Sequence, residues 1–266
     1  MRYAAFALLL TSNLAFSQNT ITTLAGTDWV FPKEVKRALE APFGTVYSVA
    51  IGPGGVPYFA DSDNQRIFKL SADGTFSVVA GNGSAGFSGD GGPALSAALN
   101  SPRGLSFDGQ GNLYFLDGQN PRLRRVTFGG TITTIAGTGQ AGFSGDDGPA
   151  LRASLSAWAP ATAVDRDGNV YIADTSNRRV RQIAPDGIIR TVAGNGQPGS
   201  TGDGGPPASA SMGPTALAFD AAGSLYIGDG ARVRVVSPEG IIAPYAGNVE
   251  SGYAGDGGPA RSALLG

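Results

Sequence analysis

The sequence repeats one pattern about four times, and this constrains the fold more than any other feature. The clearest marker is the motif Tyr-x-x-Asp, which occurs at Tyr58/Asp61, Tyr114/Asp117, Tyr171/Asp174 and Tyr226/Asp229. A second marker is an Ala-Gly pair, found at positions 80–81, 136–137, 193–194 and 246–247, with an additional copy at 25–26. A fixed period of this size indicates supersecondary units that stack on their neighbours.

Each repeat is expected to form four short strands. In the third copy these are residues 161–164, 169–173, 179–183 and 188–193. Asp-Gly pairs such as Asp186-Gly187 indicate tight hairpin turns. The second strands, for example residues 113–116, are apolar without alternation, so both of their faces must be buried. Four-stranded sheets stacked face to face describe a β-propeller, an all-β fold.

Complete blades are expected over about 43–82, 102–138, 159–195 and 213–248, separated by long glycine-rich connectors. Residues 20–24 (TITTL) resemble 131–135 (TITTI), the last strand of a repeat, and form a single orphan strand. Residues 260–266 resemble 94–100, the segment just before a first strand. We therefore expect an open part of a larger ring, such as a six-bladed one, with further domains beyond Gly266.

Residues 1–17 have the features of a signal peptide. Arg2 supplies a positive charge, residues 4–10 are apolar, and Ala15-Phe16-Ser17 provides a cleavage site with small residues. The remainder, 18–266, is then an exported domain in the periplasm, at the cell surface or outside the cell, without membrane attachment after cleavage. The chain has no cysteine, so disulfides cannot contribute to its stability.

The charge pattern bears on the class of partner. The formal net charge is −2, and the sequence contains no block of basic residues. Proteins that bind nucleic acid usually carry such a basic patch, so nucleic acid is not expected as a partner. A protein or glycan of the cell envelope or the extracellular space is the expected partner.

The repeats resemble NHL repeats, a family of propeller blades named after an Asn-His-Leu tripeptide. The resemblance rests on slots after the second strand that read Asn64-Gln65-Arg66-Ile67, Asn120-Pro121-Arg122-Leu123 and Asn177-Arg178-Arg179-Val180. It covers the chain after residue 17 and is greatest to secreted bacterial NHL proteins and to the NHL region of teneurin-like proteins. No copy has the central His, and the fourth reads Gly230-Ala231-Arg232-Val233. The resemblance implies a domain that binds other molecules, without a single shared chemistry.

An Asp-x-x-Asn-x-Arg motif lies between the second and third strands. Its members are Asp61, Asn64 and Arg66; Asp117, Asn120 and Arg122; Asp174, Asn177 and Arg179; the fourth copy retains only Asp229 and Arg232. Asp and Asn side chains stabilise turns by accepting hydrogen bonds from nearby amides. We interpret the motif as a structural turn in which the Arg reaches the Asp, because a single active site would not be copied in every blade.

The connectors carry a second motif, Gly-Asp-(Gly/Asp)-Gly-Pro. Its proline is suited to the first position of a short helix, so one or two helical turns are expected to follow, capped by the preceding Asp. Both motifs are expected at the same end of the strands, where loops would form a partner-binding face. The candidate residues of that face are Phe87, Asp90, Phe143, Asp146, Asp147, Asp203, Tyr253 and Asp256.

Catalysis is not expected, because the chain contains neither His nor Cys. These absences exclude a Ser-His-Asp triad, a cysteine nucleophile and a His-ligated zinc. Calcium is a weaker alternative: each connector offers one or two carboxylates, whereas calcium needs about six ligands. No cofactor is therefore expected. The alternatives to a binding module are a lactonase-like hydrolase or lyase with a carboxylate-bound metal in the channel, and a purely structural segment.

Overall fold

The computed structural model describes residues 37–266, which form four antiparallel β-sheets. The predicted signal peptide and the orphan strand at 20–24 lie outside the described residues. In the third sheet, two of the four expected strands have the predicted bounds, the first begins one residue later, and the second is shifted by one residue at both ends. The prediction of an all-β fold made of four-stranded blades is confirmed.

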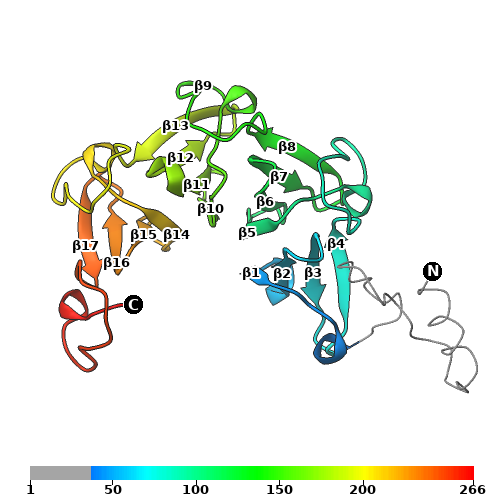
Figure 1. Ribbon diagram of the computed structural model, residues 1–266, viewed down its shortest axis with the longest axis horizontal. Coiled ribbons are helices and arrows are strands. Elements are labelled where there is room, and N and C mark those ends of the chain that lie inside the picture. Colours follow the sequence, from blue (N-terminus) through cyan, green and yellow to red (C-terminus); the bar gives the residue numbers. More distant parts are fainter. Residues whose placement is uncertain (1–36) are drawn as a thin grey trace, which may run out of the picture. The chain divides into compact units, whose positions relative to one another are not determined.

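The four blades follow one another in chain order, with the first strand of each on the inner side (Figure 1). Blade one contains β1 Val46–Ile51, β2 Pro57–Asp61, β3 Arg66–Leu70 and β4 Phe76–Ala80. Blade two contains β5 Pro102–Phe107, β6 Leu113–Asp117, β7 Arg122–Val126 and β8 Ile132–Ala136. Blade three contains β10 Thr162–Val164, β11 Val170–Asp174, β12 Arg179–Ile183 and β13 Ile188–Ala193, with β9 Gly148–Pro149 added at its outer edge. Blade four contains β14 Pro214–Phe219, β15 Leu225–Asp229, β16 Arg232–Val236 and β17 Ile242–Ala246.

The helical elements of the described region are single 3-10 turns. They are η1 Ala38–Glu40, η2 Pro53–Gly55, η3 Ala94–Ser96, η4 Ala150–Arg152, η5 Thr175–Asn177, η6 Pro207–Ser209 and η7 Ala260–Ser262. The prolines of the connector motif precede these turns in an extended conformation, for example Pro93 with φ −64° and ψ 128°. One helical turn follows each proline, as predicted, but it is a 3-10 turn, and the proline lies at the N-cap and not at the first helical position.

The core lies between successive blades. Every residue of β6 and of β11 is buried, because these second strands are covered on both faces. Between them, Leu116 and Ile172 belong to one apolar cluster that also includes Leu155 from the connector. Burial alternates along β15, in the last of the four blades. The continuous apolar runs of the sequence thus reflect stacking between neighbouring sheets.

Each connector also pairs with the outermost strand of the following blade. The backbone N–H groups of Gly91, Asp147 and Gly204 donate to the carbonyls of Ile132, Ile189 and Ile242 at 2.7–2.8 Å. An outer strand would otherwise present unpaired amides and carbonyls to solvent. The connectors therefore protect the blade edges as well as joining the blades.

The Ala-Gly marker has a steric cause. Gly137 has φ +95°, and a Cβ atom there would collide with the carbonyl oxygen of Pro121. Its N–H donates to the carbonyl of Ala150 in η4. The chain thus needs glycine where the fourth strand passes close to the turn between the second and third strands.

Candidate functional site

The Asp of the recurrent turn motif is a buried hub of hydrogen bonds. In blade two, Asp117 accepts from the backbone N–H of Asn100 at 2.6 Å and from Arg124 Nη1 at 3.0 Å. Asn120 donates from its Nδ2 to the carbonyl of Gly86 at 2.7 Å. The motif therefore ties the turn to the preceding connector, beyond its local role.

The other blades use the same Asp in a similar way. Asp174 accepts from the N–H of Ser156 at 2.8 Å and from Asn177 Nδ2 at 2.9 Å. In blade one, Asp61 accepts from the N–H of Gly44 and from both the backbone and the side-chain amide of Asn64. The carboxylates are thus engaged by amides in each of these blades.

The Arg of this motif does not make the expected contact in blades two and three. Arg122 donates instead to the carbonyls of Asn120 and Thr138, at 3.0 and 2.7 Å. The Arg two residues later, Arg124, pairs with Asp117. Both Arg side chains lie on the same side of the strand, because side chains alternate with a period of two. The prediction was wrong because Arg122 extends away from the turn towards the next connector.

In the third and first blades the motif Arg behaves similarly. Arg179 donates to the carbonyls of Asn177 and Asn195, and Arg66 donates to the carbonyl of Asn82 at 3.0 Å. In blade four the motif Arg forms an ion pair with its Asp, with Arg232 Nε 3.8 Å from Asp229 Oδ2.

Three fully buried arginines connect the turn motif to the connector motif. Arg124, Arg181 and Arg234 are each 0% exposed. Each lies between the Asp that ends the second strand of its own blade and the Asp of the connector before that blade. The pairs are Arg124 with Asp117 at 3.0 Å and Asp90 at 3.0 Å; Arg181 with Asp174 at 3.5 Å and Asp146 at 2.7 Å; Arg234 with Asp229 at 3.4 Å and Asp203 at 2.6 Å.

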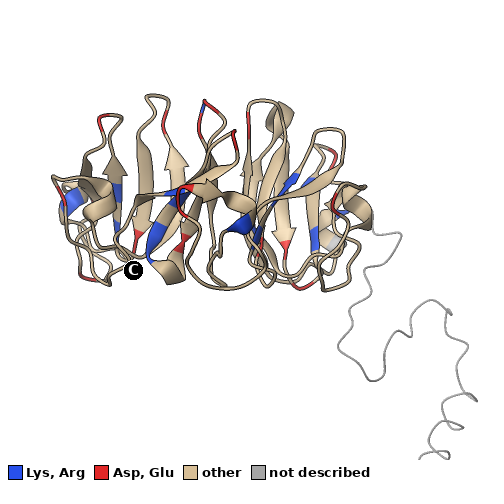
Figure 2. Ribbon diagram, turned by 90° about the horizontal axis from the view of Figure 1, so that it is seen from above, with Lys and Arg blue, Asp and Glu red and all other residues tan. Residues whose placement is uncertain are grey.

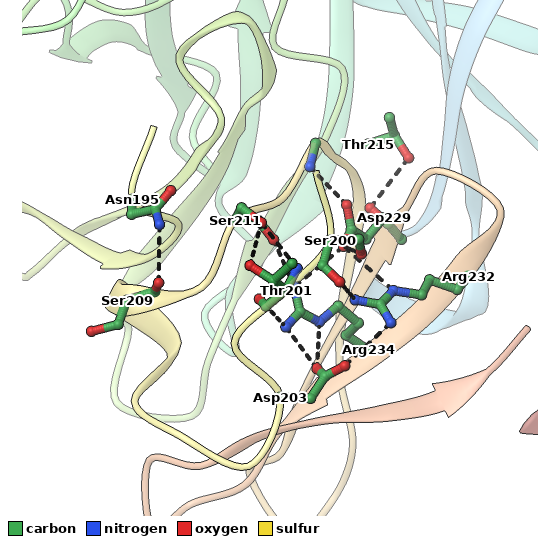
Figure 3. A network of polar contacts seen from close by, with 12 residues as sticks. Asn195, Ser200, Thr201, Asp203, Ser209, Ser211, Thr215, Asp229, Arg232 and Arg234 are labelled. Atoms are coloured by element: carbon green, nitrogen blue, oxygen red, sulfur yellow. Dashed lines mark hydrogen bonds and ion pairs between the residues drawn. The ribbon is translucent and has the colours of Figure 1, made fainter. Parts of the chain in front are cut away.

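Blade four shows this network most completely (Figure 3). Asp203 receives Arg234 through Nε and Nη2 at 2.9 and 2.6 Å, and Arg232 through Nη1 at 3.2 Å. Arg234 also donates to the carbonyls of Thr201 and Ser211. A buried guanidinium is stable only when it is paired and its donors are satisfied. The connector Asp is therefore the counter-ion of the next blade's arginine, and the prediction that it caps a helix was wrong.

Sequence reasoning missed these three arginines because the expected motif ended two residues too early. The available signal was the pair Arg-x-Arg at 122–124, 179–181 and 232–234. Blade one has Phe68 at the corresponding position, where it is also 0% exposed.

The aromatic residues of the connectors stack on the same arginines. The guanidinium carbons of Arg122 and Arg124 lie 3.8 and 4.8 Å from the ring centroid of Phe87. Phe143 repeats this geometry with the two arginines of blade three. Both rings remain about two-fifths exposed, at 41% and 42%. One face of each ring is thus fixed by cation–π contact, and part of the ring stays accessible.

The fourth connector has the same sequence motif in a different environment. Tyr253, in the position of Phe87 and Phe143, is 91% exposed, and Asp256 is exposed as well. Within residues 37–266, Asp256 takes part in no ion pair. The fourth connector nevertheless has the same backbone hydrogen bond as the others: the N–H of Gly247 donates to the carbonyl of Ala260 at 2.8 Å, as Gly137 does to Ala150.

A single arginine contacts the Asp of both recurrent motifs in each of blades two to four, so these Asp residues lie towards the same end of the strands, as expected. The rest of the connector motif does not stay at that end: it follows the outer strand of the next blade to the hairpin turn, where the N–H of Ala150 donates to the carbonyl of Gly187 at 2.8 Å. Figure 2 shows acidic residues at both ends of the sheets; the hairpin turns of the Asp-Gly type occupy the opposite end. We refer to the end of the strands with the turn motif and the Asp of the connector motif as the connector face. Arg178, in the turn motif of blade three, is exposed on it with φ +53°. Asp147 is exposed too, but at the outer edge of blade three, where its N–H donates to the carbonyl of Ile189.

The described residues contain no group of three or more His, Cys, Asp or Glu side chains arranged to hold a metal ion.

Burial raises the pKa of the Asp117 carboxyl, although hydrogen bonds from Asn120 and Asn100 and the charge of Arg124 act in the opposite direction. None of the helices in the described region has the length and apolar character needed to cross a membrane.

Four antiparallel sheets of this strand order define blades of a β-propeller. Residues 72–144 match the family model of the teneurin NHL domain. Mouse teneurin-1 is 33% identical over 155 residues, which are 52% of this chain and 6% of teneurin-1. Teneurin-3 of Danio rerio is 31% identical over 231 residues, 76% of this chain and 8% of that protein. The chain is therefore an NHL-repeat β-propeller that spans only a small part of the length of the teneurins it matches.

Solved structures of other propellers share the fold. An auxiliary nutrient binding protein from Bacteroides ovatus has a TM-score of 0.57 at 15% identity, covering 84% of this chain and 52% of that chain. Virginiamycin B lyase from Staphylococcus aureus has a TM-score of 0.51 at 18% identity, covering 79% and 58%. Identities this low show a common fold, and the fold alone does not define the function.

Proposed function

We propose that the chain is an exported, non-enzymatic module that binds a protein or glycan through the connector face. The observation that supports this proposal is the arginine network, because it fixes long loops from successive blades at one end of the strands. Loops held on a rigid scaffold are where binding sites concentrate. The half-exposed rings of Phe87 and Phe143 add apolar and aromatic area, which is frequent at binding surfaces.

The similarity to teneurin NHL domains supports a binding role. Export is proposed from the signal-peptide pattern of residues 1–17. The lactonase-like or lyase alternative has less support, because the buried Asp117 and Asp174 already accept hydrogen bonds from amides and arginines. The alternative of a purely structural segment predicts no specific ligand.

The test begins with a binding screen of the full chain against arrayed glycans and envelope or extracellular proteins. Any interaction found is then measured with Arg178→Glu, in the turn motif on the connector face, and with Arg166→Glu, an exposed arginine in the hairpin turn at the opposite end of blade three. We expect Arg178→Glu to weaken binding and Arg166→Glu to leave it unchanged. Equal effects of the two substitutions would contradict the assignment of the face.

The absence of enzymatic activity is tested separately with a panel of lactones. We expect no hydrolysis above the buffer rate. Reproducible hydrolysis that is abolished by a chelator, and by substitution of an acidic residue inside the channel, would overturn the proposal and favour the metal-dependent alternative.

A further inference from the structure

Among the buried arginines of residues 37–266, Arg103 differs in having no carboxylate partner. Arg103, at the start of β5, is 1% exposed, yet its Nε and Nη2 have no hydrogen-bond partner. Within the described part of the chain, no carboxylate pairs with it, whereas Arg124, Arg181 and Arg234 each have two. A buried charge without a counter-ion is costly unless something compensates it. Burial accordingly lowers the pKa of Arg103.

The surroundings of Arg103 are aromatic. Its guanidinium carbon lies 4.6 Å from the ring centroid of Trp158 and 5.9 Å from that of Tyr47. The two rings meet edge to face, with centroids 6.1 Å apart and an interplanar angle of 83°. Tyr47 is 51% and Trp158 is 43% exposed, so both rings are accessible. We call Tyr47, Arg103 and Trp158 the Arg103 cluster.

The backbone provides a specific place for this guanidinium. Ser62 and Thr175, which follow the Asp of the turn motif in blades one and three, donate their hydroxyls to carbonyls of the next blade. Blade two has Gly118 at this position, and any Cβ there would collide with Nε and Nη2 of Arg103. The missing side chain leaves the space in which the guanidinium lies. Arg103 is thus accommodated by a local departure from the repeat.

The cluster lies on the inner side of the blades. Tyr47 comes from β1 and Arg103 from β5, which are the innermost strands of blades one and two, and Trp158 precedes β10 of blade three (Figure 1). Three successive blades therefore contribute one residue each. Arg103 is the only charged residue on the four first strands β1, β5, β10 and β14. Pro102 pairs with Asp117, which places the cluster near the connector face.

We propose that the Arg103 cluster binds the carboxylate of a small acidic ligand at the inner edge of the connector face. A planar guanidinium matches a carboxylate through two parallel N–H···O bonds. The Nε–Nη2 edge of Arg103 lies against Gly118, so the edge formed by Nη1 and Nη2 is the one left for the ligand. A single positive charge between aromatic rings suits a singly charged, ring-bearing acid better than a phosphate, which usually recruits several cations. This inference rests on the proposed binding function and names a ligand class for the same face.

The test uses the fluorescence of Trp158 in the full chain. The chain has two tryptophans, so Trp29→Phe leaves Trp158 as the sole reporter. The probes are D-glucuronate, an acidic sugar, and phenylacetate, an aromatic acid; D-glucose and sodium chloride at equal ionic strength are the controls. We expect a saturable change in emission with at least one of the two acids and none with the controls. The acid that responds identifies the source of the carboxylate.

Two substitutions at position 103 separate binding from folding. Arg103→Met should abolish the response, and Arg103→Lys, which keeps the charge but loses the fork, should weaken it about tenfold. Arg166→Gln, at an exposed arginine in a hairpin turn, is the matched control and should bind normally. Unfolding curves show whether each variant is folded, and Arg103→Lys alone suffices if Arg103→Met does not fold.

Three results would overturn the proposal: no saturable response to either acid in the folded chain, the same response in Arg103→Lys as in the parent, or an equal response to sulfate. The first two would identify Arg103 as a structural cation held only by its aromatic neighbours. These outcomes differ from failure of the proposed function. A macromolecular ligand whose binding is weakened by Arg178→Glu but unaffected by both acids would keep the binding module and refute only the Arg103 site.

Discussion

The ion pairs between connectors and blades can be tested with a comparison that the repeat itself supplies. Asp146 and Asp256 occupy the same position of the connector motif. Asp146 accepts from Arg181 Nη2 and from Thr191 Oγ1, both at 2.7 Å, and its side chain is 29% exposed. Asp256 is exposed and forms no ion pair with any described residue. Replacing each by Ala should therefore have different consequences.

The magnitude for Asp146→Ala follows from these contacts. A hydrogen bond to a charged group contributes about 1.5–3 kcal/mol, and partial exposure reduces this value through solvent screening. Arg181 also keeps Asp174 at 3.5 Å and the carbonyl of Ser144 at 3.1 Å, so its charge remains compensated. We expect Asp146→Ala to lower the free energy of unfolding by about 1–2 kcal/mol. Asp256→Ala should change it by less than about 0.5 kcal/mol, as is usual for exposed sites.

Urea unfolding, followed by fluorescence and circular dichroism under the same conditions, measures the free energy of unfolding of both variants. A chain of this size should also show a loss of roughly 2–8 °C in Tm for Asp146→Ala. A double-mutant cycle with Arg181→Met then isolates the coupling of the pair. Equal stability losses for the two Asp substitutions, or a coupling energy near zero, would refute the view that connector carboxylates act as counter-ions of the next blade.

Further consequences follow from other contacts. Asp174→Ala should cost about 1–3 kcal/mol, because the buried N–H of Ser156 loses its acceptor while Arg181 keeps Asp146; calorimetry and urea unfolding measure the loss. Gly137→Ala should destabilise clearly more than Gly187→Ala in urea unfolding: both have positive φ, but only the first Cβ meets a backbone carbonyl. The hydroxyl and N–H of Thr75 lower the pKa of Asp73 below its ordinary value of 3.8. The contribution of the ionised Asp73 carboxylate to stability is thus present above pH 3.8 and disappears as the pH falls through the folded-state pKa. Thr75→Val should bring the pKa of Asp73 back towards 3.8 in an NMR titration.

Much of the fold could be predicted from the sequence because repetition averages out local ambiguity. The Asp-Gly turns and the unbroken apolar run of β11, residues 170–174, appear in equivalent positions of several copies, so strand bounds followed within one residue. The course of the connectors could not be predicted. Their pairing with the outer strand of the next blade, as in Asp147 with Ile189, depends on how two blades stack, and no local pattern specifies that geometry.

The candidate site was predicted less well, for the same reason. A turn motif suggests contacts within a few residues, which favoured a pair between Asp117 and Arg122. The structure pairs Asp117 with Arg124, because that arginine must also reach Asp90 on a connector 34 residues earlier. Only the joint requirement of the two carboxylates explains the choice between the two arginines, and that requirement exists only in the folded protein.

Repetition also provides a physical criterion for separating scaffold from function. A position filled alike in several blades answers a need that those blades share, as Arg124, Arg181 and Arg234 do by pairing with one buried and one partly exposed carboxylate each. A position filled once answers no such shared need. Arg103 is of this second kind. The residue at the same position of blade one is Tyr47. Gly118, which leaves room for the guanidinium of Arg103, stands where blades one and three have a hydroxyl residue. Local rules that are broken without a structural gain tend to mark functional sites. The inner edge of blade two is therefore where a ligand-specific property of this propeller is best sought.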